Sequence, residues 1–322
     1  MVNCKYSVVI PVYNGSRYLD RLSKELSSFF DDFVSKDGVG KGSNYEIILV
    51  DDGSRDDSWK KMQEVAEVDE HFRIVKLARN FGQHNATLCG LREACGEILI
   101  TMDVDLQHSP KDIPKLVAAV EGGRRLVYGK YDHKRHGGLQ NLGSWIFNRV
   151  LCDITGNKES ITSFRAFDKS VIEHISNFDN PRVILDIMFS QVVGPSDIEH
   201  VVISHGEDDG ESTYTFWKLV QFALDMLFNY STVPLRIASV LGILLSSMSF
   251  LIGVLYLVLY LSGKITVPGF TTTILAVSFL SGIILFTQGI FGEYLGRMFL
   301  IETRRPQYRI AKVIGGIKGS KK

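Results

Sequence analysis

The sequence contains few cysteines and no net charge, and none of its cysteines form a Cys-x-x-Cys pair. Its four cysteines, Cys4, Cys89, Cys95 and Cys152, therefore predict neither a disulfide framework nor a zinc site, and we expect buried, reduced thiols. The 36 basic side chains balance the 36 acidic ones, and charged residues make up 22% of the chain, a composition that excludes a polybasic nucleic-acid-binding arm. A hydrophobic content of 45% excludes a disordered chain.

Two glycine-rich phosphate-binding patterns are also absent. No Gly-x-x-x-x-Gly-Lys-Ser/Thr segment occurs, and no Gly-x-Gly-x-x-Gly follows the first expected strand. In these motifs the glycines let backbone amides approach phosphate oxygens closely. Their absence excludes a P-loop protein and a dinucleotide-binding domain of the Rossmann type.

Charge is almost missing from residues 237–292, where Lys264 is the only charged residue. Two apolar runs, about 237–261 and 270–291, flank a short connection. A helix needs about 20 apolar residues to cross the hydrocarbon core of a membrane, and both runs are long enough. We expect two transmembrane helices; the alternative is a buried helical hairpin in a soluble core.

The zero net charge is the sum of unequal regions. Residues 1–232 carry 26 basic and 34 acidic side chains, whereas residues 301–322 carry seven basic and one acidic. Because the connection between the apolar runs holds one lysine, the positive-inside rule places both flanks on the cytoplasmic side. The first residues, MVNCKYSVVIPVYN, show no secretory signal pattern. We therefore expect an integral membrane protein whose N-terminal domain lies on the cytoplasmic face.

Apolar runs and amphipathic segments alternate along the first part of the chain. This alternation predicts an α/β fold, with a mostly parallel sheet and helices on both faces. We expect strands at 6–12, 45–50, 72–78, 98–102 and 126–128, and helices at 16–33, 56–70, 85–95 and 110–121. Ser54 is expected to N-cap the second helix. The expected division of the chain is a domain at 1–212, an interfacial amphipathic helix at 213–232, two transmembrane helices within 233–300 and a basic cytoplasmic tail at 301–322.

Polar segments follow four of the expected strands, at 11–14, 51–54, 79–83 and 103–107. In parallel sheets, ligands bind beyond the carboxyl ends of the strands. Asp103 and Asp105 are two residues apart, so in an extended segment both carboxylates face one point. Such hard oxygen ligands suit Mg²⁺ or Mn²⁺, and Gln107 offers a neutral oxygen. The segment 50–54, VDDGS, has two interpretations: a capped helix start, or a carboxylate that accepts hydrogen bonds from a base or a ribose.

The same segments carry a resemblance to a known family. The chain resembles glycosyltransferase family 2, in particular polyprenyl-phosphate glycosyltransferases such as dolichol-phosphate mannose synthase and bactoprenol glucosyltransferase. The resemblance lies in SVVIPVYN (7–14), EIILVDDGSRDDS (46–58), LARNFGQHNA (77–86), MDVDLQHSP (102–110), SFRAFDKSVIE (163–173), GESTYTFWKL (210–219), VPLR (233–236) and GEYLGRMFLIETRRPQY (292–308).

The resemblance implies a GT-A fold, a nucleotide-sugar donor, a divalent metal and a lipid-phosphate acceptor. It implies that the nucleotide-sugar contacts Pro11, Tyr13, Asn14, Asp52, Arg79 and Gln83. It implies that the metal lies against Asp103, Asp105 and Gln107, and that Asp103, Asp105 and Arg165 act in catalysis. Arg165 would face the transfer site, or else form a structural ion pair. The acceptor and its phosphate would contact Lys130, Arg135, Ser144 and Asn148.

The chain departs from the family pattern at two places. Many relatives have Asp directly before Phe-Arg, where this chain has Ser163. The loop before Gly-Glu-Ser often carries Arg, but here it reads HGEDD (205–209), and the usual Lys after that motif is Thr213. The first departure leaves any general base unidentified, and the second leaves open which cations complete the phosphate site.

A phosphate acceptor reduces the need for a base. A phosphomonoester with a second pKa near 6 is already an anionic nucleophile at pH 7. Positioning and charge neutralisation then matter more than a general base, which contributes roughly 10²–10⁴-fold. We expect inverting transfer of a sugar from a UDP- or GDP-sugar to undecaprenyl or dolichyl phosphate. The alternatives are a processive polysaccharide synthase, whose Gln-x-x-Arg-Trp motif this sequence lacks, and an inactive membrane-anchored scaffold.

Aromatic and small residues suggest further contacts with the membrane and with other copies of the chain. Residues 215–230 place apolar and aromatic side chains along one helical stripe, which suits a helix in the membrane interface or one packed on the domain. Small residues in the first apolar run, including Gly242, Ser246 and Gly253, make a homo-oligomer plausible. No nucleic-acid partner is expected.

Overall fold

The computed structural model describes residues 4–36, 45–131, 162–175, 183–204, 233–262, 269–303 and 306–316. The chain divides into two compact units. One comprises Met1–Tyr214 together with Arg304–Lys322, and the other comprises Thr215–Thr303.

An eight-stranded sheet forms the centre of the first unit, in the order β7-β5-β6-β4-β1-β2-β3-β8. Strands β1, β2, β3 and β4 are mutually parallel, β5 pairs in parallel with β7, and β6 and β8 are antiparallel to their neighbours. The strands are β1 (Tyr6–Val12), β2 (Tyr45–Asp51), β3 (Phe72–Leu77), β4 (Ile98–Thr101), β5 (Leu126–Tyr131), β6 (Arg165–Asp168), β7 (Ile198–Ile203) and β8 (Ile310–Gly315). The mostly parallel α/β sheet predicted from the sequence is confirmed.

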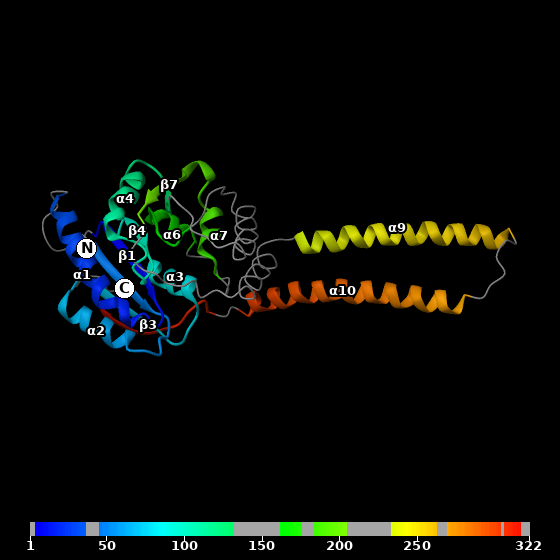
Figure 1. Cartoon of the computed structure of the whole chain (residues 1–322), viewed down its shortest axis with the longest axis horizontal. Coiled ribbons are helices and arrows are strands. Elements are labelled where there is room, and N and C mark those ends of the chain that lie inside the picture. Colours follow the sequence, from blue (N-terminus) through cyan, green and yellow to red (C-terminus); the bar gives the residue numbers. More distant parts are fainter. Residues whose placement is uncertain are drawn as a thin grey trace. The chain divides into compact units, whose positions relative to one another are not determined.

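Helices cover both faces of this sheet (Figure 1). One face carries α1 (Ser16–Lys36), α2 (Ser58–Val68) and α4 (Ile113–Glu121), the last preceded by the short 3-10 helix η1 (Pro110–Asp112). The other carries α3 (Gln83–Glu93), α6 (Lys169–Ile175) and α7 (Leu185–Ser190). A second 3-10 helix, η2 (Pro195–Asp197), precedes β7.

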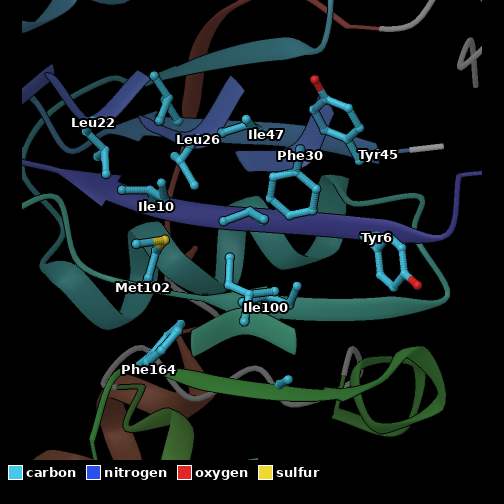
Figure 2. Packing of buried hydrophobic residues seen from close by; sticks show 14 of the residues in the cluster. Tyr6, Ile10, Leu22, Leu26, Phe30, Tyr45, Ile47, Ile100, Met102 and Phe164 are labelled. Atoms are coloured by element: carbon cyan, nitrogen blue, oxygen red, sulfur yellow. The ribbon is translucent and has the colours of Figure 1, made fainter. Parts of the chain in front are cut away.

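The alternation of side chains along the strands builds two cores. Val8 and Ile10 of β1 pack toward α1, whereas Val9 between them packs toward α3. Leu22, Leu26 and Phe30 of α1 meet these strands on the first face (Figure 2). Because both faces are covered, the central strands are buried along their whole length, as their largely hydrophobic sequence predicted.

Strand β8 follows the second apolar helix in the chain but belongs to the sheet of the first unit. It pairs antiparallel with β3, with Val75 opposite Val313 and Lys76 opposite Lys312. Tyr308, just before it, lies against the guanidinium of Arg92, whose central carbon is 5.7 Å from the ring centre. The basic tail expected at 301–322 therefore contains an edge strand that its composition does not indicate.

The second unit contains two long helices, α9 (Val233–Leu261) and α10 (Phe270–Glu302). Each includes a window long and apolar enough to cross a membrane, at Pro234–Leu255 and Phe279–Gly296. Only 6% and 0% of the residues in these windows are buried inside the protein. A hairpin buried in a soluble core would have its side chains covered, so this alternative does not describe these helices.

The expected helices form with shifted ends. Helix α2 begins at Ser58 with Asp57 at its N-cap position, whereas Ser54 was expected to cap it. The Ser54 hydroxyl instead accepts a hydrogen bond from the backbone N–H of Asn14 at 3.0 Å. The proposed interfacial helix at 213–232 lies outside the described residues.

Candidate active site

The topology brings the four polar segments to one edge of the sheet. Strands β4, β1, β2 and β3 are neighbours and run in the same direction, so their carboxyl ends meet there. Strand β6 runs the opposite way, with Arg165 opposite Thr101. The residues just before β6, Thr162 and Ser163, therefore reach the same edge.

The loops after β1 and β2 are joined by hydrogen bonds. The backbone N–H of Arg55 donates to the Asn14 side-chain oxygen at 2.8 Å, and the N–H of Ser54 donates to Asp51 Oδ1 at 2.9 Å. Asn14 has a positive φ of 52°, a conformation that asparagine tolerates better than most residues. Asp51 Oδ2 is buried and has no hydrogen-bond partner among the described residues.

Asp52 connects the loop after β2 to the loop after β3. Its two carboxylate oxygens accept the backbone N–H groups of Phe81 at 2.7 Å and Gly82 at 2.9 Å. Burial raises the pKa of Asp52, while these two hydrogen bonds oppose the shift. Asp52, expected to contact the nucleotide, is 2% exposed and shapes the site by holding the 79–82 loop.

Gly53 is required where these two loops touch. Its φ is 70°, and a Cβ added there would lie 2.6 Å from the backbone carbon of Arg79 and from the nitrogen of Asn80. Any side chain would push the loops apart, because the obstructing atoms are backbone and cannot swing away.

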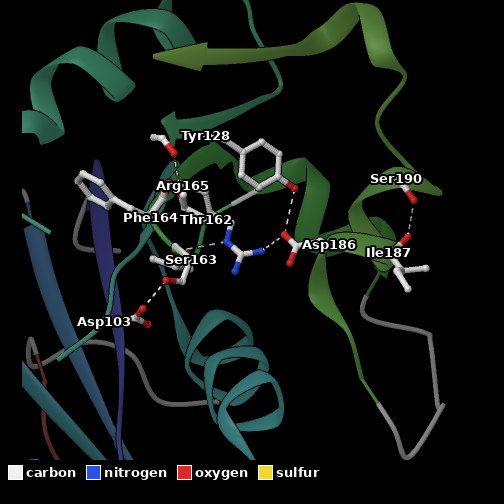
Figure 3. A network of polar contacts seen from close by, with 11 residues as sticks. Asp103, Tyr128, Thr162, Ser163, Phe164, Arg165, Asp186, Ile187 and Ser190 are labelled. Carbon is white, nitrogen blue, oxygen red and sulfur yellow. Dashed lines mark hydrogen bonds and ion pairs between the residues drawn. The ribbon is translucent and has the colours of Figure 1, made fainter. Parts of the chain in front are cut away.

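Asp103 is held from two sides. Gln83 Nε2 donates to Oδ1 at 2.6 Å, and the Ser163 hydroxyl donates to Oδ2 (Figure 3). The backbone N–H of Asp103 donates to His108 Nδ1 at 3.1 Å. The His108 ring stacks on that of Phe164, with centroids 5.0 Å apart. Gln83, expected at the nucleotide-sugar, here positions an expected metal ligand.

The segment 103–107 is a turn, which corrects the expectation that it is extended. Strand β4 ends at Thr101, and Leu106 has a positive φ of 65°. The backbone N–H of Gln107 donates to Asp105 Oδ1 at 3.2 Å, which closes the turn. Strand alternation therefore cannot aim both carboxylates at one point, and any convergence must come from the turn.

The donor chemistry of this turn fits a hard divalent cation. Asp103 and Asp105 supply carboxylate oxygens, and the Gln107 side-chain amide makes no hydrogen bond to the described part of the chain. The neighbouring Tyr131 hydroxyl donates to the Gln107 carbonyl at 3.4 Å. Burial, followed by the charges of Asp105 and Asp103, raises the pKa of Tyr131 to about 12. Negative charge therefore accumulates here, as a cation site requires.

Arg165 forms the structural ion pair that the sequence analysis left open. Its Nη1 pairs with Asp186 Oδ1, and the two side chains are 4% and 9% exposed (Figure 3). The Tyr128 hydroxyl donates to the same oxygen at 3.1 Å. Arg165 Nε also donates to the Ser163 carbonyl at 3.4 Å. Through that contact the pair supports the residue that binds Asp103.

The remaining expected residues are distributed around the edge. Pro11 is buried in β1, whereas Tyr13 is 46% exposed and Asn14 is exposed. The guanidinium of Arg79 lies 4.8 Å from the ring centre of Phe81. Lys130 lies near the end of β5, which points to the same edge as β4. Arg135, Ser144 and Asn148 lie outside the described residues.

Three side chains outside the set of expected site residues shape the site: Ser163 as a partner of Asp103, His108 as an anchor of its backbone, and Asp186 as the partner of Arg165. Ser163 was noted only as a departure from the family pattern. Asp186 is 21 residues beyond Arg165, a separation that carries no local signal.

Comparisons with known proteins identify the family of this chain. The family model described as "Glycosyl transferase family 2" matches residues 7–176. The chain belongs to glycosyltransferase family 2. It is 33% identical over 323 residues to the undecaprenyl-phosphate 4-deoxy-4-formamido-L-arabinose transferase of Proteus mirabilis, covering 98% of this chain and 96% of the relative. The transferase of the same name from Photorhabdus laumondii is 32% identical, with 98% and 95% covered.

This family-2 chain also shares its fold with a solved enzyme. Glucosyl-3-phosphoglycerate synthase from Mycobacterium tuberculosis, in complex with Mn²⁺, UDP-glucose and phosphoglyceric acid, matches with a TM-score of 0.53 at 19% identity. The match covers 70% of this chain and 79% of the synthase. At this identity the likeness shows the GT-A fold alone.

Proposed function

We propose that this family-2 enzyme transfers a sugar from a nucleotide-sugar to the phosphate of a polyprenyl phosphate at the cytoplasmic face of a membrane. The observation that carries the proposal is the extent of the match to the two undecaprenyl-phosphate transferases. It covers 98% of the chain, so it includes the two apolar helices as well as the sheet. A lipid acceptor accounts for such helices, because they would hold the enzyme at the membrane surface where the acceptor phosphate lies.

Bound at Asp103, Asp105 and Gln107, Mg²⁺ or Mn²⁺ would stabilise the negative charge on the departing nucleoside diphosphate. Gln83 and Ser163 hold the Asp103 carboxylate for that role, and Asp52 fixes the loop that carries Gln83. Tyr13, Asn14 and Arg79 are exposed around the edge where the donor would bind.

The acceptor supplies its own nucleophile. An oxygen of the lipid phosphate attacks the anomeric carbon as the bond from that carbon to the diphosphate breaks, which inverts the configuration. No proton has to be removed, because the phosphate is already anionic. Ser163, where many relatives have Asp, is consistent with such a base-free transfer, and Lys130, near the end of β5, is the proposed contact for the acceptor phosphate.

The test is transfer by purified full-length protein in detergent, with Mn²⁺ or Mg²⁺, undecaprenyl phosphate and a panel of UDP- and GDP-sugars. The panel includes UDP-linked 4-deoxy-4-formamido-L-arabinose. We expect one donor to give a lipid-linked monosaccharide, and chelation of the metal to stop the reaction. Absence of product with every donor would favour the scaffold, and a polymeric product would favour the processive synthase.

Asp105→Asn tests the metal assignment because it removes a charge with little change in volume. Transfer is expected to fall at least about 100-fold, with an unchanged Tm. Asp57→Asn is the matched control, because Asp57 is exposed and its side chain makes no capping bond. Near-normal turnover by Asp105→Asn would refute the assignment.

A further inference from the structure

Three metal-ligating side chains converge at the amino ends of β1, β2 and β4, the sheet edge opposite the candidate active site. Cys4 lies two residues before β1, Glu46 is the second residue of β2, and Cys95 lies between α3 and β4. The two sulfur atoms and a carboxylate oxygen of Glu46 lie within 4.8 Å of one another. The two cysteines are far apart in the sequence, so cysteine spacing could not reveal the cluster.

Glu46 is a buried carboxylate that has no cationic partner in the part of the chain that the structure describes. It is 2% exposed, and among the described residues no Lys, Arg or His pairs with it. Its contacts are the Ser7 hydroxyl at 2.6 Å and the backbone N–H of Cys95 at 2.7 Å, both to Oε1. Buried charges in proteins are ordinarily paired or coordinate a metal. A bound cation would therefore balance the charge of Glu46.

The hydrogen bonds orient Glu46 as a ligand. The backbone N–H of Gly96 donates to Ser7 Oγ at 2.8 Å, and Ser7 in turn donates to Glu46. A Cβ on Gly96 would lie 2.6 Å from Ser7 Oγ, so this close approach requires glycine. Both bonds are to Oε1, and no described residue bonds to Oε2, which is therefore left for an ion. Hydrogen bonds to a ligand side chain fix its orientation and raise its affinity for the metal.

We propose that Cys4, Glu46 and Cys95 bind a zinc ion. Two thiolates and a carboxylate form a ligand set that Zn²⁺ favours, and water from the half-buried Cys95 side completes the tetrahedron. Binding releases the two thiol protons to solvent and leaves the site with one negative charge. Lys169, whose Nζ donates to the Cys95 carbonyl at 3.3 Å, lies close enough to offset that charge.

This site does not depend on the proposed transferase function. Cobalt is the probe, because bonds from thiolates to Co²⁺ produce a near-ultraviolet charge-transfer band that oxygen ligands do not produce. Full-length protein with Cys89→Ser and Cys152→Ser retains only Cys4 and Cys95. Stripped of metal and fully reduced, it is expected to develop the band on addition of Co²⁺. One equivalent of Zn²⁺ per chain is expected to abolish it, and Asp105→Asn to leave it unchanged.

Substitutions at the site separate zinc binding from nonspecific effects. Cys95→Ser is expected to lose the band, and Ser7→Ala to weaken Co²⁺ binding by about 10–100-fold without removing a ligand. The absence of a band in reduced wild-type protein would overturn the proposal, as would a band that persists in Cys95→Ser. If a variant fails to fold, the wild-type spectrum and its Zn²⁺ stoichiometry still decide the question.

Discussion

Asp103 accepts hydrogen bonds at both carboxylate oxygens, from Gln83 and from Ser163. Where many relatives have an Asp, this chain thus has a hydroxyl that donates to an expected metal ligand. An Asp at position 163 would place a second negative charge beside Asp103 and accept rather than donate. The serine therefore fits a positioning role better than a role as general base.

Ser163→Ala is expected to lower transfer by about 10–100-fold, because Asp103 loses one of the contacts that orient it. The affinity for Mn²⁺, measured by titration, should weaken together with the rate. Ser190→Ala is the matched control: its partly buried hydroxyl donates to the Ile187 carbonyl within α7. A thousandfold loss of rate with unchanged Mn²⁺ affinity would instead assign Ser163 to proton transfer.

Residue types at strand ends could be predicted from the sequence, but their partners could not. Asp52 and Asp103 were identified because each follows an apolar strand in a parallel sheet. Their contacts with Phe81, Gly82 and Ser163 depend on how separate loops approach one another, which no local pattern records. The Cys4 and Cys95 cluster was missed for the same reason: spacing along the chain does not measure distance across a sheet.

At the scale of elements, the contact between the β2 and β3 loops sets the shape of the donor side. Gly53→Ala is expected to raise the KM for the nucleotide-sugar by about tenfold, because its Cβ would collide with the backbone of Arg79 and Asn80. Gly123→Ala is the control, since Gly123 has a φ of 98° and open space around its Cα. Both substitutions strain the backbone. An equal rise of KM in the two variants would therefore contradict the claim that the collision of the Cβ with the neighbouring loop raises KM.

Strand β8 shows why hydrophobic periodicity located most elements but not this one. The central strands are buried on both faces and appear as largely apolar runs, whereas β8 is an edge strand with Lys312 and Val313 exposed. The sequence of β8 is short and mixes apolar with polar residues. The basic residues around it are already explained by the positive-inside rule, so they give no sign of a strand. Pairing with a strand more than 230 residues earlier is a tertiary contact that the local sequence does not encode.

Removal of residues 306–322 is expected to lower the Tm and promote aggregation, because it exposes the edge of β3 to other chains. The loss is expected to be at least about 2 kcal/mol, since Tyr308, Ile310 and Ile314 leave the two cores they pack against. Removal of 317–322 alone takes away three lysines but keeps β8, so it should be neutral. If the two truncations lower the Tm equally, the loss of stability comes from the removal of the lysines and not from the loss of strand β8.

For the whole molecule, the sheet constrains how the chain crosses a membrane. Strands β1 to β7 precede α9 and strand β8 follows α10, yet all belong to one folded unit. Both ends of the helical hairpin must therefore lie on the same side of any membrane that it spans. This conclusion comes from strand pairing, and it agrees with the two-span topology inferred from hydrophobicity. The positive-inside rule predicts that this side is the cytoplasmic one.

Single cysteines introduced at the two ends of the hairpin test this topology. Ser262→Cys lies at the exposed end of α9, and Thr303→Cys lies just beyond α10. In intact cells, a membrane-impermeant maleimide is expected to label Ser262→Cys and not Thr303→Cys, with the pattern reversed in inside-out vesicles. Labelling of the unchanged chain is the background in each case. Labelling of both positions from one side would show that the helices lie on the membrane without crossing it. Labelling of Thr303→Cys alone in intact cells would place the sheet on the outer face, away from cytoplasmic nucleotide-sugars.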